Sequence, residues 1–157
     1  MTDARFEDGD EAPLRLIAQD PEDVPVLAAL LQDAVLPITE MRFDRKARRF
    51  LMLVNRFRWE DRAGAEAAKR PYERVRSLLV IDDVLHLRSH GIDRTDRDTI
   101  LSLLTLEFAP GPDGTGTLTL TLAGDGALAI QVEAVNLRLE DVTRPYVAPS
   151  RKVPDHG

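Results

Sequence analysis

A run of arginines between residues 42 and 62 contains the side chains of this sequence that are best suited to bind an anion. The segment has eight basic and three acidic residues, whereas residues 1–33 have nine acidic and two basic ones. A guanidinium pairs with a phosphate or a carboxylate through two parallel hydrogen bonds. The segment can therefore recruit an anionic partner, although the acidic start of the chain can equally neutralise it.

The far end of this segment combines arginine with aromatic residues. In a strand, Arg56 and Arg58 share one face, and Phe57 and Trp59 share the other. One interpretation is a surface that contacts phosphate and stacks bases, as in proteins that bind single-stranded nucleic acid. The alternative, which we favour, places the rings in the core and pairs the arginines with the chain's own carboxylates. The candidate residues for binding a ligand or partner are Arg45, Arg48, Arg49, Arg56, Arg58 and Trp59.

Two of the three histidines, His86 and His90, stand four residues apart, a spacing that binds metal on a helix. The surrounding residues alternate in polarity and predict a strand, in which positions four apart are separated by about 13 Å. Ligands of one zinc ion lie within about 2.1 Å of it, so we predict no metal site. His86, Arg88 and His90 are instead expected to form a polar outer face.

No motif of a nucleophilic, nucleotide-binding or metalloprotease site is present in the sequence. The chain has no cysteine, which excludes a disulfide, a thiolate metal site and a thiol nucleophile. The adjacent carboxylates Asp82 and Asp83 would point to opposite faces of a strand, so they cannot act together on one substrate atom. We therefore name no catalytic residue and no cofactor, and favour a protein that is not an enzyme.

The elements that must position these residues follow from the spacing of the apolar residues. Asp20 and Pro21 are suited to begin a helix, and the apolar stripe after them predicts one that ends before Pro37. The period then changes to two, which predicts a β-hairpin over residues 39–57 with a turn at residues 45–47. Residues 60–72 are expected to form a loop or a short helical excursion, and residues 93–98 a solvated connector. Further segments of strand character are 14–18, 74–92 with a bend at 82–83, 100–108, 115–122, 127–133 and 137–139.

These elements predict an α+β fold, in which one N-terminal helix packs on a mostly antiparallel sheet or a partly closed barrel of about six to seven strands. Whether the helix lies across a sheet face or in the mouth of a barrel stays open. Residues 1–12 are interpreted as a flexible acidic arm, 13–143 as a single domain and 144–157 as a C-terminal tail. Exposed strand edges leave room for a homodimer.

The expected compartment is the cytoplasm. No apolar run approaches the roughly 20 residues that cross a bilayer, and the start lacks the regions of a secretory signal, so we expect no membrane partner. The net charge of −6 disfavours nucleic acid as a general partner.

Several short stretches carry a family resemblance, above all Leu31-Gln32-Asp33-Ala34-Val35 and residues 55–60, with residues 14–18, 49–50 and 139–141 beside them. Through them the chain resembles a family of small bacterial proteins, the domain of unknown function 2948, over about residues 13–146. The resemblance implies a single cytoplasmic bacterial domain. No activity, cofactor or catalytic residue is attached to this family, so the resemblance implies no function.

Two functional hypotheses are carried forward. The leading one is a non-enzymatic interaction or adaptor domain, whose basic hairpin binds an unknown protein partner through the arginines of its turn. The second is a pocket between the helix and the sheet that binds a small anion, with or without catalysis, through Arg56, Arg58 or the polar face around His86. Nucleic-acid binding is a third and less favoured hypothesis.

Overall fold

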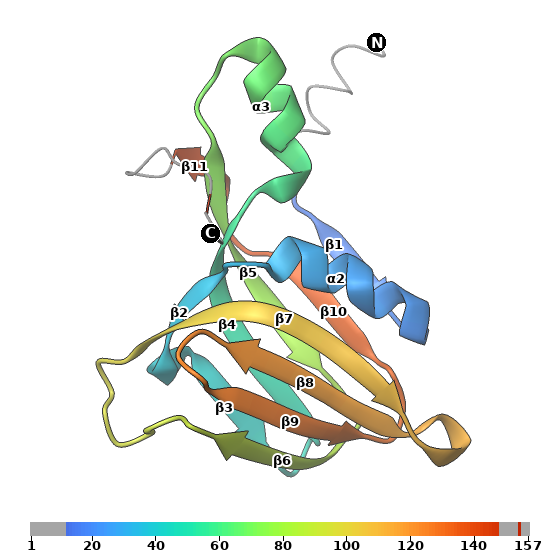
Figure 1. Ribbon diagram of the computed structural model, residues 1–157. Coiled ribbons are helices and arrows are strands. Elements are labelled where there is room, and N and C mark those ends of the chain that lie inside the picture. Colours follow the sequence, from blue (N-terminus) through green and yellow to red (C-terminus); the bar gives the residue numbers. More distant parts are fainter. Residues whose placement is uncertain (1–11, 148–153, 155–157) are drawn as a thin grey trace.

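Eleven strands form one antiparallel sheet in the computed structural model, which describes residues 12–147 and residue 154 (Figure 1). The strand order is β1-β10-β5-β4-β2-β7-β8-β9-β6, with β3 beside β4 and β11 beside β5. The strands are β1 (Arg15–Ala18), β2 (Val35–Pro37), β3 (Met41–Asp44), β4 (Arg49–Phe57), β5 (Glu73–Ile81), β6 (Val84–His90), β7 (Ile100–Pro110), β8 (Gly116–Leu122), β9 (Ala127–Val132), β10 (Leu137–Asp141) and β11 (Tyr146–Val147). The sheet is not closed into a barrel, because β1 and β6 at its two ends do not pair with each other.

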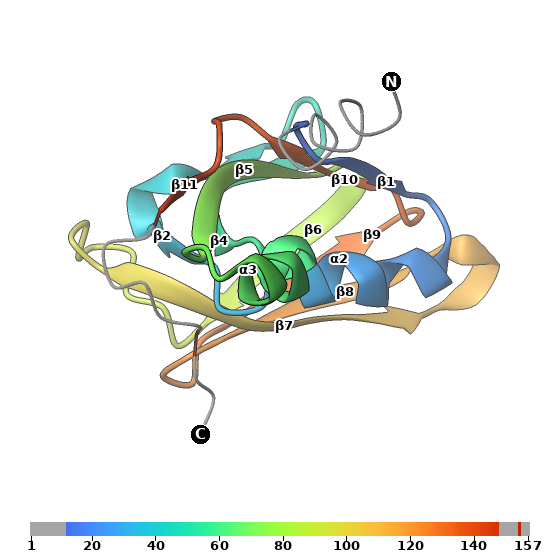
Figure 2. The ribbon, with the colours of Figure 1, turned by 90° about the horizontal axis from the view of Figure 1, so that it is seen from above.

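The sheet curls so that two layers face each other (Figure 2). One layer contains β1, β10, β5 and β4, the other contains β7, β8, β9 and β6, and the short β2 joins them between β4 and β7. Alternate residues of each layer point inward, as in β8, where Leu118, Leu120 and Leu122 are buried and the threonines between them are partly exposed. The inward residues of both layers form one hydrophobic core.

The predicted N-terminal helix is confirmed as the 3-10 turn η1 (Pro21–Asp23) followed by α2 (Val24–Leu31). Its apolar stripe buries Val24, Leu27 and Leu31, each of them at most 2% exposed. The helix lies in the opening between β1 and β7, so it covers the core from the side (Figures 1 and 2). Within the described part of the chain, no helix has the length and apolar character needed to cross a membrane.

The predicted α+β class is right, but the predicted count of elements is too coarse. A second helix, α3 (Arg62–Ala68), follows the 3-10 turn η3 (Trp59–Asp61) in the segment expected to be a loop or a short helical excursion. The strands β2 and β11 have three and two residues, which is too short for a period of two to show in the sequence. Within the segment predicted as a tail, β11 pairs with Glu73 and Arg74; residues 1–11 of the predicted arm lie outside the described residues.

The predicted hairpin is present as β3 and β4, in a register that sets Phe43 opposite Phe50. Its turn is held by the backbone N–H of Ala47, which donates to the carboxylate of Asp44 at 3.1 Å, and Arg48 takes the left-handed conformation with φ 55°. The bend predicted at residues 82–83 is also present, because β5 ends and β6 begins on either side of it. This bend carries the chain from one layer to the other, and thereby brings β6 close to the hairpin.

Candidate functional site

A cavity of about 560 Å³ lies where the edge of β3 approaches β6 and β9. Its walls also include the 3-10 turn η2 (Ile38–Glu40) and the connector between β6 and β7, residues 91–99, which loops out on the left of Figure 1. Four arginines line it, and we call it the arginine pocket: Arg42, Arg45, Arg94 and Arg97. None of the described residues that line the cavity is acidic.

The floor of the arginine pocket is apolar. It consists of Ile38, Met41, Phe43, Phe50, Leu87 and Leu128. Phe50 and Leu128 belong to the core and are only 2% and 3% exposed, whereas Phe43 and Leu87 are partly open to solvent. These side chains are reachable because β3 pairs only with β4 and β6 pairs only with β9 among the described strands, so no strand covers the core between them.

The four arginines of the pocket are exposed and form no ion pair within the described residues. None of them lies within 4.0 Å of a carboxylate in the described part of the chain, whereas other arginines of the hairpin do. The guanidinium carbon of Arg45 lies 5.8 Å from the centre of the Phe43 ring, within the range of a cation–π interaction. The pocket therefore combines a hydrophobic floor with a cationic rim.

Two of the three acidic residues of the connector, Asp93 and Asp96, accept hydrogen bonds from the connector itself. Asp93 accepts hydrogen bonds from the hydroxyl of Thr95 at 2.5 Å and from its N–H at 2.9 Å, and these bonds lower the pKa of Asp93. Asp96 accepts from the N–H of Asp98 at 3.1 Å. These bonds fix the backbone of the connector, whose Arg94 and Arg97 line the cavity.

Of the six residues predicted from the sequence, only Arg45 lines this pocket. Arg48 and Arg49 lie at the same end of the hairpin, but each has a carboxylate partner. Arg48 pairs with Glu133 at 2.6 Å, and Arg49 pairs with Asp82 at 2.6 Å. Both pairs bind the hairpin turn to the other layer or to the bend between β5 and β6, so they act as structural contacts.

Arg56 is completely buried, on the inner face of β4. Its guanidinium donates to both carboxylate oxygens of Glu60 at 2.9 and 2.8 Å, to Asp141 at 3.0 Å, to the hydroxyl of Ser77 at 3.0 Å and to the carbonyl of Phe57 at 3.4 Å. These bonds use all five N–H donors of the side chain. Arg56 is therefore paired with the protein's own carboxylates, as the favoured interpretation of the sequence expects.

Arg58 and Trp59 also serve the packing at this end of β4. The Arg58 side chain is 7% exposed and pairs with Glu73 at 2.5 Å. The indole N–H of Trp59 donates to the carbonyl of Gln32 at 2.9 Å, and its ring lies 4.6 Å from that of Phe57. The nine residues from Arg49 to Phe57 span about 26 Å of strand, so this end is far from the arginine pocket.

Sequence reasoning missed three of the four pocket arginines as candidates. Arg42 lies in the basic segment but stands on the strand before the turn, and Arg94 and Arg97 lie in the stretch interpreted as a solvated connector. No local pattern links residues 94 and 97 to residue 42. Only the pairing of β6 with β9, and the approach of β9 to the hairpin, brings them together.

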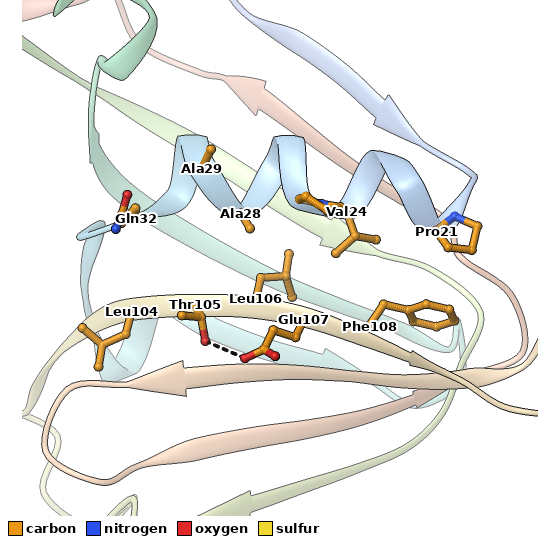
Figure 3. A pocket seen from close by; sticks show the side chains of 11 residues that line it. Pro21, Val24, Ala28, Ala29, Gln32, Leu104, Thr105, Leu106, Glu107 and Phe108 are labelled. Atoms are coloured by element: carbon orange, nitrogen blue, oxygen red, sulfur yellow. Dashed lines mark hydrogen bonds between the residues drawn. The ribbon is translucent and has the colours of Figure 1, made fainter.

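A second cavity, of about 520 Å³, lies in the groove between α2 and β7 (Figure 3). Small and apolar side chains line most of it. Glu107 is the only charged residue among the described ones that line it, and it accepts a hydrogen bond from Thr105 at 3.3 Å. The pocket that the second hypothesis expected between helix and sheet therefore contains neither Arg56 nor Arg58. Its chemistry does not suit an anion.

The polar face predicted around His86 is exposed on β6. His86 lines a smaller cavity of about 290 Å³, which shares Phe43, Arg45 and Leu87 with the arginine pocket. No group of three or more metal-binding side chains occurs among the described residues. His86 thus lies beside the arginine pocket.

The comparisons with known proteins give a family and no activity. Neither the curated proteins nor the solved structures include a match to this chain. The family model described as protein of unknown function (DUF2948) matches residues 14–156. Because this match covers nearly the whole chain, the protein belongs to the DUF2948 family.

Proposed function

We propose that the protein is a binding domain for an organic anion that carries an apolar group, and that the arginine pocket is its site. The observation that carries this proposal is the pairing state of the arginines. Arg48, Arg49, Arg56 and Arg58 have carboxylate partners, whereas the four pocket arginines have none within the described residues.

The shape and chemistry of the pocket support a ligand with two parts. Its volume lies within the roughly 300–1,000 Å³ typical of ligand sites. The apolar floor favours a hydrocarbon or aromatic body by about 25 cal/mol for each Å² removed from water. The guanidinium groups at the rim favour a negative head and fix its orientation.

The charges of the whole chain support the same ligand. The protein has a net charge of −6, so an anion is repelled by most of its surface and attracted at this pocket. Binding there breaks no internal ion pair within the described residues, in contrast to binding at Arg48 or Arg56. The ligand therefore gains the full attraction of the rim.

The test is isothermal titration calorimetry with three compounds that share an octyl chain: octyl sulfate, octanoate and the neutral octyl glucoside. We expect saturable binding of the two anions and none of the glucoside. The pocket variant, in which Arg42, Arg45, Arg94 and Arg97 are changed to glutamine, should lose this binding and keep the native circular dichroism spectrum.

The control variant changes four other exposed basic residues to glutamine: Arg15, Lys46, Arg62 and Arg88. It has the same net charge as the pocket variant, but none of its positions lines the pocket. It should bind the anions as the native protein does. If neither anion binds, or if the pocket variant binds them undiminished, the proposal is wrong.

A protein partner at the same surface is the second candidate function, and the edges of β3 and β6 favour it. Each of these strands pairs on one side only among the described strands, so an extended acidic segment could add to either edge. The structure also changes the test of the adaptor hypothesis, because Arg48 and Arg49 are held in ion pairs. Replacing Arg42 and Arg45 with glutamate should abolish capture of such a partner without loss of fold.

A further inference from the structure

We infer that the anionic head recognised by the arginine pocket is a phosphate monoester in its dianionic form. This inference rests on the proposed function, since it names the head group of the same ligand. It follows from the number of arginines, from the elements that carry them and from the way in which a guanidinium binds oxygen.

The rim offers four guanidinium groups to one head, whereas the head of a carboxylate or of a sulfate ester has a single negative charge. Two arginines come from the hairpin, Arg42 and Arg45, and two from the connector, Arg94 and Arg97, and no acidic side chain lines the cavity with them. Glu40, Asp44, Asp93, Asp96 and Asp98 are close by in the chain and offset part of this charge, but none of them lines the cavity. A dianion is attracted about twice as strongly at the same distance, because the Coulomb energy scales with the product of the charges.

The oxygens of a phosphate monoester also match two pairs of guanidinium groups better than a carboxylate does. A carboxylate has two oxygens in one plane, and therefore presents a single edge for a bidentate pair with arginine. A phosphate monoester has three terminal oxygens in a tetrahedral arrangement. Arginines from the hairpin and from the connector can each pair with a different edge of the same head.

Protonation of the phosphate head provides a test that does not depend on the apolar part of the ligand. The second pKa of a phosphate monoester is about 6, so the head changes from one to nearly two negative charges between about pH 5 and pH 7.5. Arginine keeps its charge over this range. Affinity for a phosphate ester should therefore rise with pH, whereas affinity for a sulfate ester of the same length should not.

Other ionisable groups near the pocket have to be separated from the ligand. They are His86 and His90 on β6, Glu40 and Asp44 on the hairpin side, and Asp93, Asp96 and Asp98 in the connector. A variant with His86 and His90 changed to glutamine removes these two side chains as a source of pH dependence.

The experiment measures the dissociation constants of octyl phosphate and octyl sulfate at about pH 5 and pH 7.5. We expect octyl phosphate to bind roughly tenfold more tightly than octyl sulfate at the higher pH, and the two to bind within about twofold of each other at the lower pH. The variant lacking both histidines should show the same dependence. If octyl sulfate and octyl phosphate bind equally at the higher pH, this inference is wrong and the proposed anion-binding function stands. If neither binds, both are wrong.

A second variant tests the bidentate geometry while keeping the charge. Changing the four pocket arginines to lysine leaves four positive charges but removes the fork of each guanidinium. We expect octyl phosphate and octyl sulfate both to bind more weakly to this variant, because both heads present three terminal oxygens to the forks, whereas the advantage of octyl phosphate, which comes from its second charge, should remain. Undiminished affinity of both compounds in this variant would contradict the inferred pairing.

The source of the phosphate ester is resolved by two further probes. Vesicles that contain phosphatidic acid present the same head on a lipid, and vesicles that contain phosphatidylglycerol present a phosphodiester in its place. Sedimentation of the protein with the first vesicles only would place the ligand on a lipid, whereas binding of octyl phosphate without sedimentation would assign a free metabolite. Inorganic phosphate that binds as tightly as octyl phosphate would contradict the role of the apolar floor.

Discussion

The two ends of β4 carry arginines in opposite circumstances. At the end near α3, Arg56 and Arg58 are buried and held by carboxylates from three different elements. At the hairpin end, Arg42 and Arg45 are exposed beside the connector arginines, and no described carboxylate lies within ion-pair distance of them. Arginine thus stabilises the fold at the first end, whereas at the hairpin end Arg48 and Arg49 are paired and Arg42 and Arg45 stay available for a ligand.

The contrast follows from the cost of burying a charge. A guanidinium inside a protein must be paired and fully hydrogen-bonded, because removing it from water costs several kcal/mol. At the surface no such requirement exists, and an unpaired arginine remains solvated. The pairing state therefore distinguishes arginines that serve the fold from arginines that can serve binding, and each prediction below tests one side of this distinction.

The largest effect is expected for Arg56→Met. Removal of the guanidinium leaves Asp141, whose side chain is 4% exposed, without its buried cationic partner. Breaking such a pair typically costs about 3–5 kcal/mol of unfolding free energy, measured by urea denaturation. Arg42→Met, at the other end of the hairpin, is the control and should change stability by less than about 0.5 kcal/mol. A loss below about 1 kcal/mol for Arg56→Met would contradict a structural role for this residue.

A smaller effect, with a characteristic pH dependence, is expected for Asp61→Asn. The hydrogen bond from Arg70, at 2.6 Å, holds the pKa of the buried Asp61 carboxyl below its ordinary value, and the charge of Arg58 adds to the effect. Because the folded pKa is the lower one, the carboxylate contributes stability above its unfolded pKa of about 4, and this contribution is lost as the pH falls through the folded pKa.

Denaturation of the native protein and of Asp61→Asn across this pH range measures that contribution. At neutral pH the variant should be less stable by about 1.5–3 kcal/mol, the usual loss for a hydrogen bond to a charged group. The difference should shrink as the pH falls below about 4. A difference that is constant with pH would assign the loss to packing around Asp61 instead of to its charge.

The internal pairing of Arg56 and Arg58 could be partly predicted from the sequence. The alternation in residues 55–60 places two arginines on one strand face, and the acidity of the chain supplies partners for them, so internal pairing was the favoured interpretation. The partners themselves could not be identified. Asp141 lies 85 residues from Arg56 and reaches it only because β10 and β4 both pair with β5.

The arginine pocket could not be predicted, for a related reason. Each element that forms it has a local signal: the hairpin through its period of two, and the connector through its run of polar residues. Arg94 and Arg97 nevertheless look like ordinary solvated residues until β6 is placed beside β9 and across from β3. A pocket built from strand edges that lack a partner depends on the order of strands, which periodicity does not give.

A still smaller effect is expected for Arg48→Gln, although the ion pair of Arg48 with Glu133 is only 2.6 Å long. Arg48 and Glu133 are both exposed, at 44% and 57%, so water and salt screen the charges that they bring together. The urea midpoint should fall much less than in Asp61→Asn, and about 1 M salt should remove the difference. A double-mutant cycle with Glu133→Gln measures the coupling. A salt-independent loss would show that the turn depends on this arginine for packing.

The smallest effect on stability is expected for the variant in which all four pocket arginines become glutamine. These side chains have no described carboxylate to release, and their removal relieves the repulsion among four like charges lining one cavity. No ion pair is lost within the described residues and the gain from reduced repulsion is small, so the unfolding free energy should stay within about 0.5 kcal/mol of the native value at low salt. A loss approaching that of Arg56→Met would mean that the rim stabilises the fold, and the arginines of both ends would then have the same role. An unchanged stability, together with loss of anion binding, would separate the two ends of β4 by function.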